Sequence, residues 1–149
     1  MVITSKSVSW LLLVGRILIS LIFLMAGLNK FMNYDATAQM ISSKGIEPNA
    51  LLVYGAGLIE VIGALSLIFG FKTRWGALLL FLFLIPSTFI MHDFWNFSGM
   101  EMQNQMIHFL SNLAILGGLL HVIATGPGCC SCDLRHTCDV HDLHDKNQV

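Results

Sequence analysis

The chain has 149 residues, of which 55% are hydrophobic and only 11% are charged, whereas soluble globular domains carry about 25% charged residues. This composition excludes a disordered chain, which needs low hydrophobicity and high charge. A net charge of −1 without a basic stripe also argues against a nucleic-acid-binding protein. We therefore expect a small integral membrane protein.

Four long intervals of the sequence contain almost no charge. Arg16 and Glu60 are the only charged residues inside the first two intervals, and the last two have none. A membrane-spanning helix needs about 20 mainly apolar residues, so each interval can supply one. The sequence predicts an all-α, polytopic membrane protein, in which domain 1–128 is a four-transmembrane-helix bundle and 129–149 is a separate tail. The predicted spans are about 8–31, 49–71, 74–92 and 103–124.

The first span is expected to be retained rather than cleaved as a signal peptide. Arg16 interrupts its apolar run, and no small-residue cleavage site follows. With four spans, both chain ends lie on the same side of the membrane. The positive-inside rule places that side in the cytoplasm, because it carries more basic residues than the opposite side. The side of the chain ends carries Lys6, Lys72, Arg74, Arg135 and Lys146, and the opposite side carries Lys30 and Lys44.

Arg16 and Glu60 each lie near the middle of a predicted span, at a depth of about 12 Å or more for a rise of about 1.5 Å per residue. A charge at that depth usually faces the bundle interior and has a partner. The first two spans run antiparallel, so an Arg16–Glu60 ion pair is geometrically feasible. Such a pair would either lock the helices together or form the floor of a working site.

Further polar residues share helix faces toward one end of the predicted bundle. Gln105, His108 and Asn112 follow the spacing of a single helix face, and Lys30 shares a face with Arg16. These faces predict one polar pocket that runs from the outer surface to mid-membrane. Its floor would hold Arg16, Glu60 and Asn112, and its outer part Lys30, His92, Asp93, Gln105 and His108.

A quinone head group suits such a pocket. A quinone carbonyl needs hydrogen-bond donors and a quinol needs a proton acceptor, and a histidine near neutral pH can serve as either. A transport path, a lipid head-group site, or simple interhelical hydrogen bonding remain alternatives. The quinone hypothesis assigns catalytic roles to His92, His108 and Glu60, and quinone binding to Arg16, Lys30, Trp95, Gln105 and Asn112.

The composition changes abruptly after Gly126-Pro127-Gly128. The tail holds all 4 cysteines of the chain and three of its 6 histidines. Thiolates and imidazoles suit Zn²⁺ or a soft metal such as Cu(I), although Cys-Cys-x-Cys is tighter than the usual zinc spacing. The alternatives are lipidated or redox-active thiols, a tail that packs on the membrane surface, or, if the topology is inverted, disulfides. The candidate metal ligands are Cys129, Cys130, Cys132, His136, Cys138 and His141.

Several of these residues occur in an order that resembles the DoxX family of small four-helix bacterial membrane proteins. The matching pieces, over about residues 10–128, are Gly15-Arg16, Ala26-Gly27-x-x-Lys30-Phe31, Glu60-x-x-Gly63, Lys72-Thr73-Arg74, His92-x-Phe94-Trp95, Asn112-Leu113-Ala114-x-x-Gly117-Gly118 and Gly126-Pro127-Gly128. The resemblance implies a four-helix bundle in the bacterial inner membrane. The family name derives from a relative in a thiosulfate:quinone oxidoreductase, which implies a quinone or redox-partner role by analogy. The Cys/His tail departs from the family pattern, so its role does not carry over.

Together these patterns predict a quinone-interacting subunit of a membrane redox or thiol-stress system. As an enzyme, it would be a quinone-linked oxidoreductase subunit. The expected partners are the lipid bilayer, a quinone or lipid-like small molecule and a soluble redox protein, with no nucleic acid, and Gly-rich faces permit a homo-oligomer. The alternatives are a non-enzymatic soft-metal carrier and a membrane scaffold for soluble redox enzymes.

Overall fold

A computed structural model describes residues 5–128 and 131–133 of the chain. Its elements in chain order are α1 (Ser5–Met32), α2 (Tyr34–Ser43), α3 (Ala50–Phe69), α4 (Thr73–Met91), the 3-10 turn η1 (Phe94–Asn96) and α5 (Gly99–Thr125). Within these described residues, four helical segments are long and apolar enough to cross a membrane. The predicted all-α, four-span fold is therefore confirmed.

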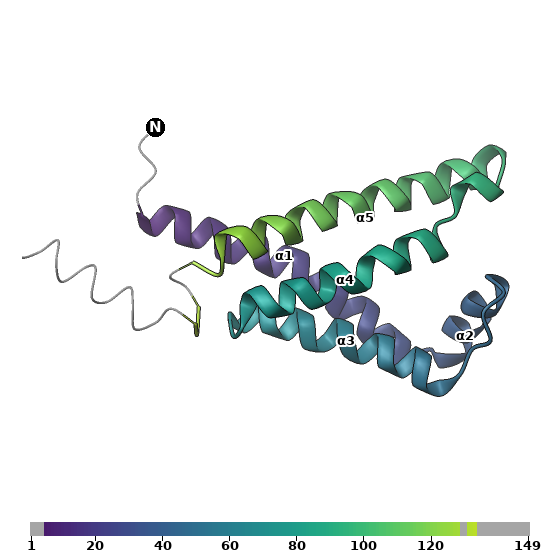
Figure 1. Ribbon diagram of the computed structural model, residues 1–149, viewed down its shortest axis with the longest axis horizontal. Coiled ribbons are helices and arrows are strands. Elements are labelled where there is room, and N and C mark those ends of the chain that lie inside the picture. The colour runs from purple at the N-terminus through teal and green to yellow at the C-terminus, as the bar shows by residue number, and fades with distance from the viewer. Residues whose placement is uncertain (1–4, 129–130, 134–149) are drawn as a thin grey trace, which may run out of the picture.

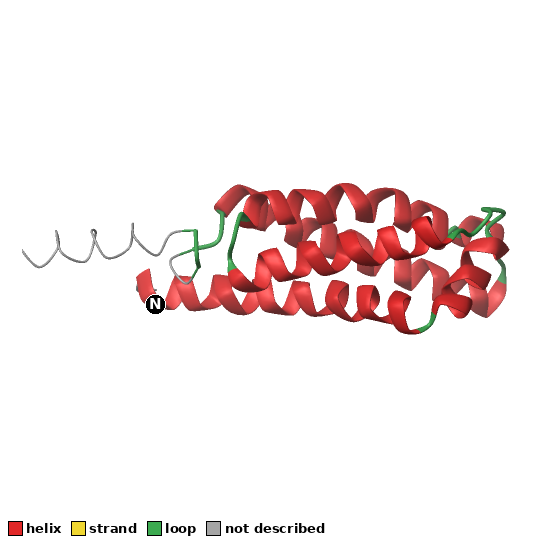
Figure 2. Ribbon diagram, turned by 90° about the horizontal axis from the view of Figure 1, so that it is seen from below, coloured by secondary structure: helices red, strands yellow, loops and turns green. Residues whose placement is uncertain are grey.

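The four long helices run alternately in opposite directions (Figures 1 and 2). α1 packs mainly against α3, α5 packs mainly against α4, and the contact between α3 and α4 joins the two pairs. We call the end that holds the start of α1, the α3–α4 turn and the end of α5 the terminal end. The opposite end, which holds α2 and η1, is the loop end.

Large apolar side chains lie on both the inside and the outside of the bundle. Leu67, Leu80 and Leu119 are fully buried between the helices, whereas side chains such as Leu18 and Leu113 are exposed along the outer faces. In water, such a large apolar surface would promote aggregation. In a bilayer the same surface faces lipid, so the burial pattern agrees with the membrane assignment.

Two features of the loop end differ from the sequence-based expectation. The connection expected as a loop over 32–48 contains α2, whose one buried residue is Ile41 and whose Tyr34 ring lies 5.3 Å from the Tyr54 ring of α3. The last span was expected from residue 103, but α5 begins at Gly99. The absence of charge sets the limit of the expected span, but Glu101 lies in the first turn of α5, where a carboxylate favours a helix because it complements the positive end of the helix dipole.

Candidate functional site

Glu60 is held by Lys30, and the predicted Arg16–Glu60 ion pair is wrong. Lys30 Nζ donates to Glu60 Oε1 at 3.0 Å and to Oε2 at 2.8 Å, which links α1 to α3. The side chain of Glu60 is only 7% exposed and that of Lys30 is 21% exposed. The buried carboxylate is therefore compensated on both of its oxygen atoms.

The crossing of α1 and α3 explains this choice of partner. A Cβ added at Gly27 would lie 2.8 Å from the carbonyl oxygen of Gly57, so the two backbones approach closely there. Side chains on a helix lean toward its N-terminus. Because α1 and α3 are antiparallel, Lys30 and Glu60 both lean toward this crossing and meet. By the same rule, Arg16 and Glu60 lean apart.

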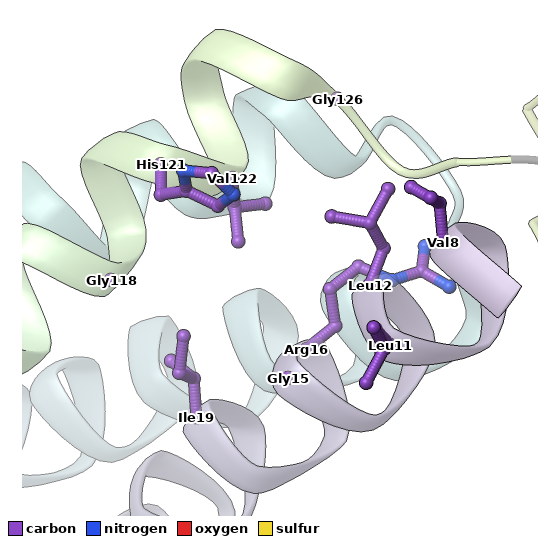
Figure 3. A pocket seen from close by; sticks show the side chains of 10 residues that line it. All are labelled: Val8, Leu11, Leu12, Gly15, Arg16, Ile19, Gly118, His121, Val122 and Gly126. Atoms are coloured by element: carbon purple, nitrogen blue, oxygen red, sulfur yellow. The ribbon is translucent and has the colours of Figure 1, made fainter. Parts of the chain in front are cut away.

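Arg16 lies instead at the terminal end and is only 1% exposed. Figure 3 shows its side chain beside Leu12 of the same helix. Its Nη1 atom would be 2.8 Å from a Cβ added at Gly70, the residue that ends α3. Gly70 lies about ten residues beyond Glu60, or roughly 15 Å of helix rise. Asn112 is half-buried on α5, and no hydrogen bond joins it to Glu60 within the described residues. The predicted floor of Arg16, Glu60 and Asn112 is therefore not assembled.

The last described residues fold back over the α3–α4 turn. The carboxylate of Asp133 accepts hydrogen bonds from the backbone N–H of Lys72 at 2.8 Å, and from the backbone N–H and hydroxyl of Thr73 at 3.0 and 3.1 Å. Burial raises the pKa of this carboxyl, but the hydrogen bonds outweigh it and hold the pKa below its ordinary value. Gly70 has φ of 67°, and a Cβ there would lie 2.5 Å from Ser131 Cβ, so this docking requires glycine.

Of the predicted metal ligands, only Cys132 lies within the described residues. Its side chain is exposed, and its backbone N–H donates to the Phe69 carbonyl at 3.3 Å. No group of three or more His, Cys, Asp or Glu side chains in the described part of the chain is arranged to hold a metal ion. A metal site in the tail therefore stays a prediction. The remaining candidates, Cys129, Cys130, His136, Cys138 and His141, lie outside the described residues.

The loop end brings His92, Gln105 and His108 together. His92 Nδ1 lies 3.0 Å from Gln105 Oε1, and the imidazole rings of His92 and His108 stack with their centroids 5.3 Å apart. Gln105 Nε2 donates to Glu101 Oε1 at 3.2 Å. A carboxylate only accepts hydrogen bonds, so this contact turns the Gln105 carbonyl oxygen toward His92. In this arrangement His92 Nδ1–H donates to Gln105 Oε1, and Nε2 is the acceptor of the neutral imidazole tautomer that makes this hydrogen bond.

Aromatic rings gather at the same junction of α4, η1 and α5. Their centroids lie 5.2 to 6.5 Å apart in tilted or edge-to-face pairs, the arrangements that aromatic side chains prefer. Trp95 is exposed. Phe109 directly follows His108 on α5, which brings the rings next to the histidines. We call this set the aromatic cluster, and its members are Phe89, Phe94, Trp95 and Phe109.

An ion pair joins the two helix pairs at the loop end. Lys44, which follows α2, binds Asp93, which follows α4, and both side chains are largely buried. Asp93 also accepts from Asn96 Nδ2 at 2.8 Å, and Lys44 Nζ lies 5.0 Å from the centre of the Phe97 ring. Sequence reasoning placed Asp93 in the site but missed Lys44 and Glu101, because residue spacing within one helix cannot show which loop residue reaches another helix pair.

The histidines and the Lys30–Glu60 pair belong to different helix pairs. Within the described residues, no hydrogen bond joins Glu60 to His92 or His108. The predicted single pocket therefore separates into three polar groups toward the loop end, with Arg16 apart from them at the terminal end. The three groups are the Lys30–Glu60 pair, the Lys44–Asp93 pair and the His92–Gln105–His108 cluster.

Known proteins resemble the chain over most of its length. The family model described as DoxX matches residues 11–93. Inner membrane protein YphA of Escherichia coli K12 is 36% identical over 125 residues, which cover 84% of this chain and 89% of YphA. Inner membrane protein YqjF of the same strain is 38% identical over 121 residues, covering 81% and 88%. Surfeit locus protein 4 homolog of Schizosaccharomyces pombe is 32% identical over 91 residues, but these cover only 29% of that protein. No solved structure is significantly similar to the chain.

Proposed function

The chain belongs to the DoxX family and is a multi-pass inner-membrane protein, and from that premise we propose that its loop end binds a quinone head group. In this proposal the protein is a quinone-interacting subunit of a membrane redox or thiol-stress system. The observation that carries the proposal is the ordered contact from Glu101 through Gln105 to His92, with His108 stacked on the His92 ring.

This contact chain suits proton exchange with a quinone. When its Nδ1–H donates a hydrogen bond to Gln105, His92 presents Nε2 as a base that can take a proton from a quinol hydroxyl. Once protonated, the same atom donates a hydrogen bond to a quinone carbonyl oxygen. Glu101 supports the positive charge that develops on His92 through Gln105, in the way that a carboxylate orients a catalytic histidine.

The aromatic cluster supports the same ligand. A quinone head group is flat and largely apolar, and stacks on aromatic faces, while its polar oxygen atoms seek the two imidazoles. Reduction of a quinone to a quinol consumes two protons and two electrons. The histidines would exchange the protons with water at the loop end, and a soluble redox partner protein would supply the electrons.

Quinone content tests this proposal. The protein is purified in mild detergent, extracted with organic solvent, and its quinone is measured by mass spectrometry against protein concentration. Loss of a hydrogen bond to a charged partner corresponds to a roughly tenfold loss of affinity or more, so His92→Ala should carry about a tenth of the quinone of the wild type. His121→Ala is the matched control, because His121 is a histidine at the terminal end of α5, away from the loop-end cluster. A wild-type protein that neither carries quinone nor takes it up when it is added would refute the proposal.

We also propose that both termini face the cytoplasm. Lys72 and Arg74 lie in the α3–α4 turn at the terminal end, and Lys30 is tied up in an ion pair at the loop end, which strengthens the charge asymmetry on which the positive-inside rule acts. A membrane-impermeant thiol reagent should label Cys132 only after spheroplasts are permeabilised. Equal labelling of intact and permeabilised spheroplasts would reverse the orientation.

A further inference from the structure

A groove separates α1 from α5 at the terminal end of the bundle (Figure 3). It has a volume of about 330 Å³, within the range of about 300–1,000 Å³ typical of small-molecule sites. Its walls are mainly apolar and include Leu12 and Ile19 from α1 and Val122 from α5, and Arg16 and His121 also line it. This groove is distinct from the loop-end site.

The groove lies where α1 and α5 contact each other much less than each contacts its main partner. Gly15 and Gly118 line it from the two sides. A Cβ added at Gly15 would meet nothing within 4 Å, so the space beside it is open. Exposed apolar residues such as Leu11 border this opening, which therefore faces the surrounding lipid.

Positive charge is concentrated at one end of the groove. Figure 3 shows the Arg16 guanidinium at the end near Val8 and Gly126, with Ile19 and Gly118 at the other end. The exposed Arg74 lies beside Gly126 at the same end, because its Nε would be 3.2 Å from a Cβ added at Gly126. Since Asp133 acts on Arg16 electrostatically, Arg74 is the more available of the two charges for an anion.

We propose that this groove binds one acyl chain of an anionic phospholipid, with the lipid phosphate at the exposed Arg74, while the buried Arg16 adds positive charge at the same end of the groove. The apolar walls toward Ile19 and Gly118 receive the chain in the membrane interior. The guanidinium groups lie at the terminal end, where the head groups of that leaflet are. Basic pockets between transmembrane helices recognise anionic head groups by the same combination of charge and apolar surface.

Native mass spectrometry of the full chain tests this proposal. The protein is released from vesicles of equal phosphatidylglycerol and phosphatidylethanolamine, and its bound lipids are counted. The wild type should retain phosphatidylglycerol in preference to phosphatidylethanolamine. Arg74→Gln should weaken phosphatidylglycerol retention about fivefold, as expected for one basic group at a membrane surface, and should leave phosphatidylethanolamine unchanged. Equal retention of both lipids by the wild type would overturn the proposal.

A matched pair of glycine variants separates the groove from general lipid contact. Gly15→Leu fills the groove without a backbone clash, whereas Gly117→Leu adds the same side chain where a Cβ also meets nothing within 4 Å but outside the groove lining. Gly15→Leu should lose the bound phosphatidylglycerol and Gly117→Leu should keep it, at equal melting temperatures. Equal retention by the two variants would contradict the proposal.

Two other occupants give different results in the same experiment. If the tail filled the groove, a chain ending at Asp133 would bind more phosphatidylglycerol than the full chain, and the proposal would fail. If a quinone filled it, Gly15→Leu would lose quinone and His92→Ala would not. That second outcome would refute both this proposal and the loop-end quinone site. If the wild type instead showed no preference for phosphatidylglycerol but still lost quinone in His92→Ala, only the lipid proposal would fail.

Discussion

Breaking the Lys30–Glu60 contact should destabilise the packing of α1 on α3. Removing one partner of a fully buried ion pair costs about 3–5 kcal/mol, because a charge is left buried without compensation. Glu60 is 7% exposed but Lys30 is 21% exposed, so solvent reduces this cost. We expect Lys30→Met and Glu60→Gln each to lower the free energy of unfolding by about 2–3 kcal/mol.

The double variant distinguishes a coupled pair from two independent losses. Lys30→Met with Glu60→Gln removes both charges, so its loss should be about 2 kcal/mol smaller than the sum of the single losses. Reversible unfolding in mixed detergent and SDS micelles, followed by circular dichroism, measures these free energies. Lys72→Gln with Glu60→Gln is the control, since Lys72 lies at the terminal end and its effect should add. If the Lys30–Glu60 double variant were also additive within about 0.5 kcal/mol, the pair would not hold the helices together.

Three further variants test other contacts. Gly27→Ala should lower the free energy of unfolding by about 1–3 kcal/mol, because the added Cβ would meet the Gly57 backbone. Gly55→Ala, whose Cβ would meet nothing within 4 Å, should raise the free energy of unfolding by up to about 1 kcal/mol. Equal effects of the two substitutions would contradict a close crossing of α1 and α3 at Gly27. Asp133 has a lowered pKa, so the stability that it contributes is present above the ordinary carboxyl pKa of about 3.9 and is lost as pH falls through the lower, folded-state value. The melting temperatures of wild type and Asp133→Asn should therefore differ at neutral pH and converge on acidification, and a gap that is unchanged by pH would contradict this. Lys44→Gln should speed limited proteolysis between α2 and α3, and an unchanged cleavage rate would mean that the Lys44–Asp93 pair does not restrain this segment.

The helical spans follow directly from the spacing of charges along the sequence. Each end of a predicted span lies one to four residues from the end of the observed helix, because the bilayer demands a length that the chain must supply. The short helix α2 does not follow from that rule. It depends on the burial of Ile41 and on the contact between Tyr34 and Tyr54, which a charge pattern cannot reveal.

The partner of Glu60 could have been found by a different argument. Depth estimates along the helix axis put Arg16 and Glu60 at similar levels and ignored where their side chains point. The lean of side chains toward the helix N-terminus favours Lys30, which lies on the same face of α1. The small residues at Gly27 and Gly57 then fix the level at which the two side chains meet.

The histidine contacts were predictable in part. Spacing placed Gln105 and His108 on one face of the last span, and His92 at the end of the span before it. The role of Glu101 was not predictable, because it depends on the orientation of the Gln105 amide. The docking of residues 131–133 over the α3–α4 turn was also not predictable, because it depends on backbone N–H groups of Lys72 and Thr73 that donate to Asp133.

Photoaffinity labelling with a quinone analogue tests the central claim most directly, because it reports where the head group lies. The analogue carries its photoreactive group on the head, and labelled peptides of the protein in native membranes are identified by mass spectrometry. Labelling should fall on residues 89–109, compete with unmodified quinone, and be lost in His92→Ala but kept in His121→Ala. Competed labelling of residues 8–19 and 118–126 instead would place the quinone in the groove between α1 and α5 and contradict the account.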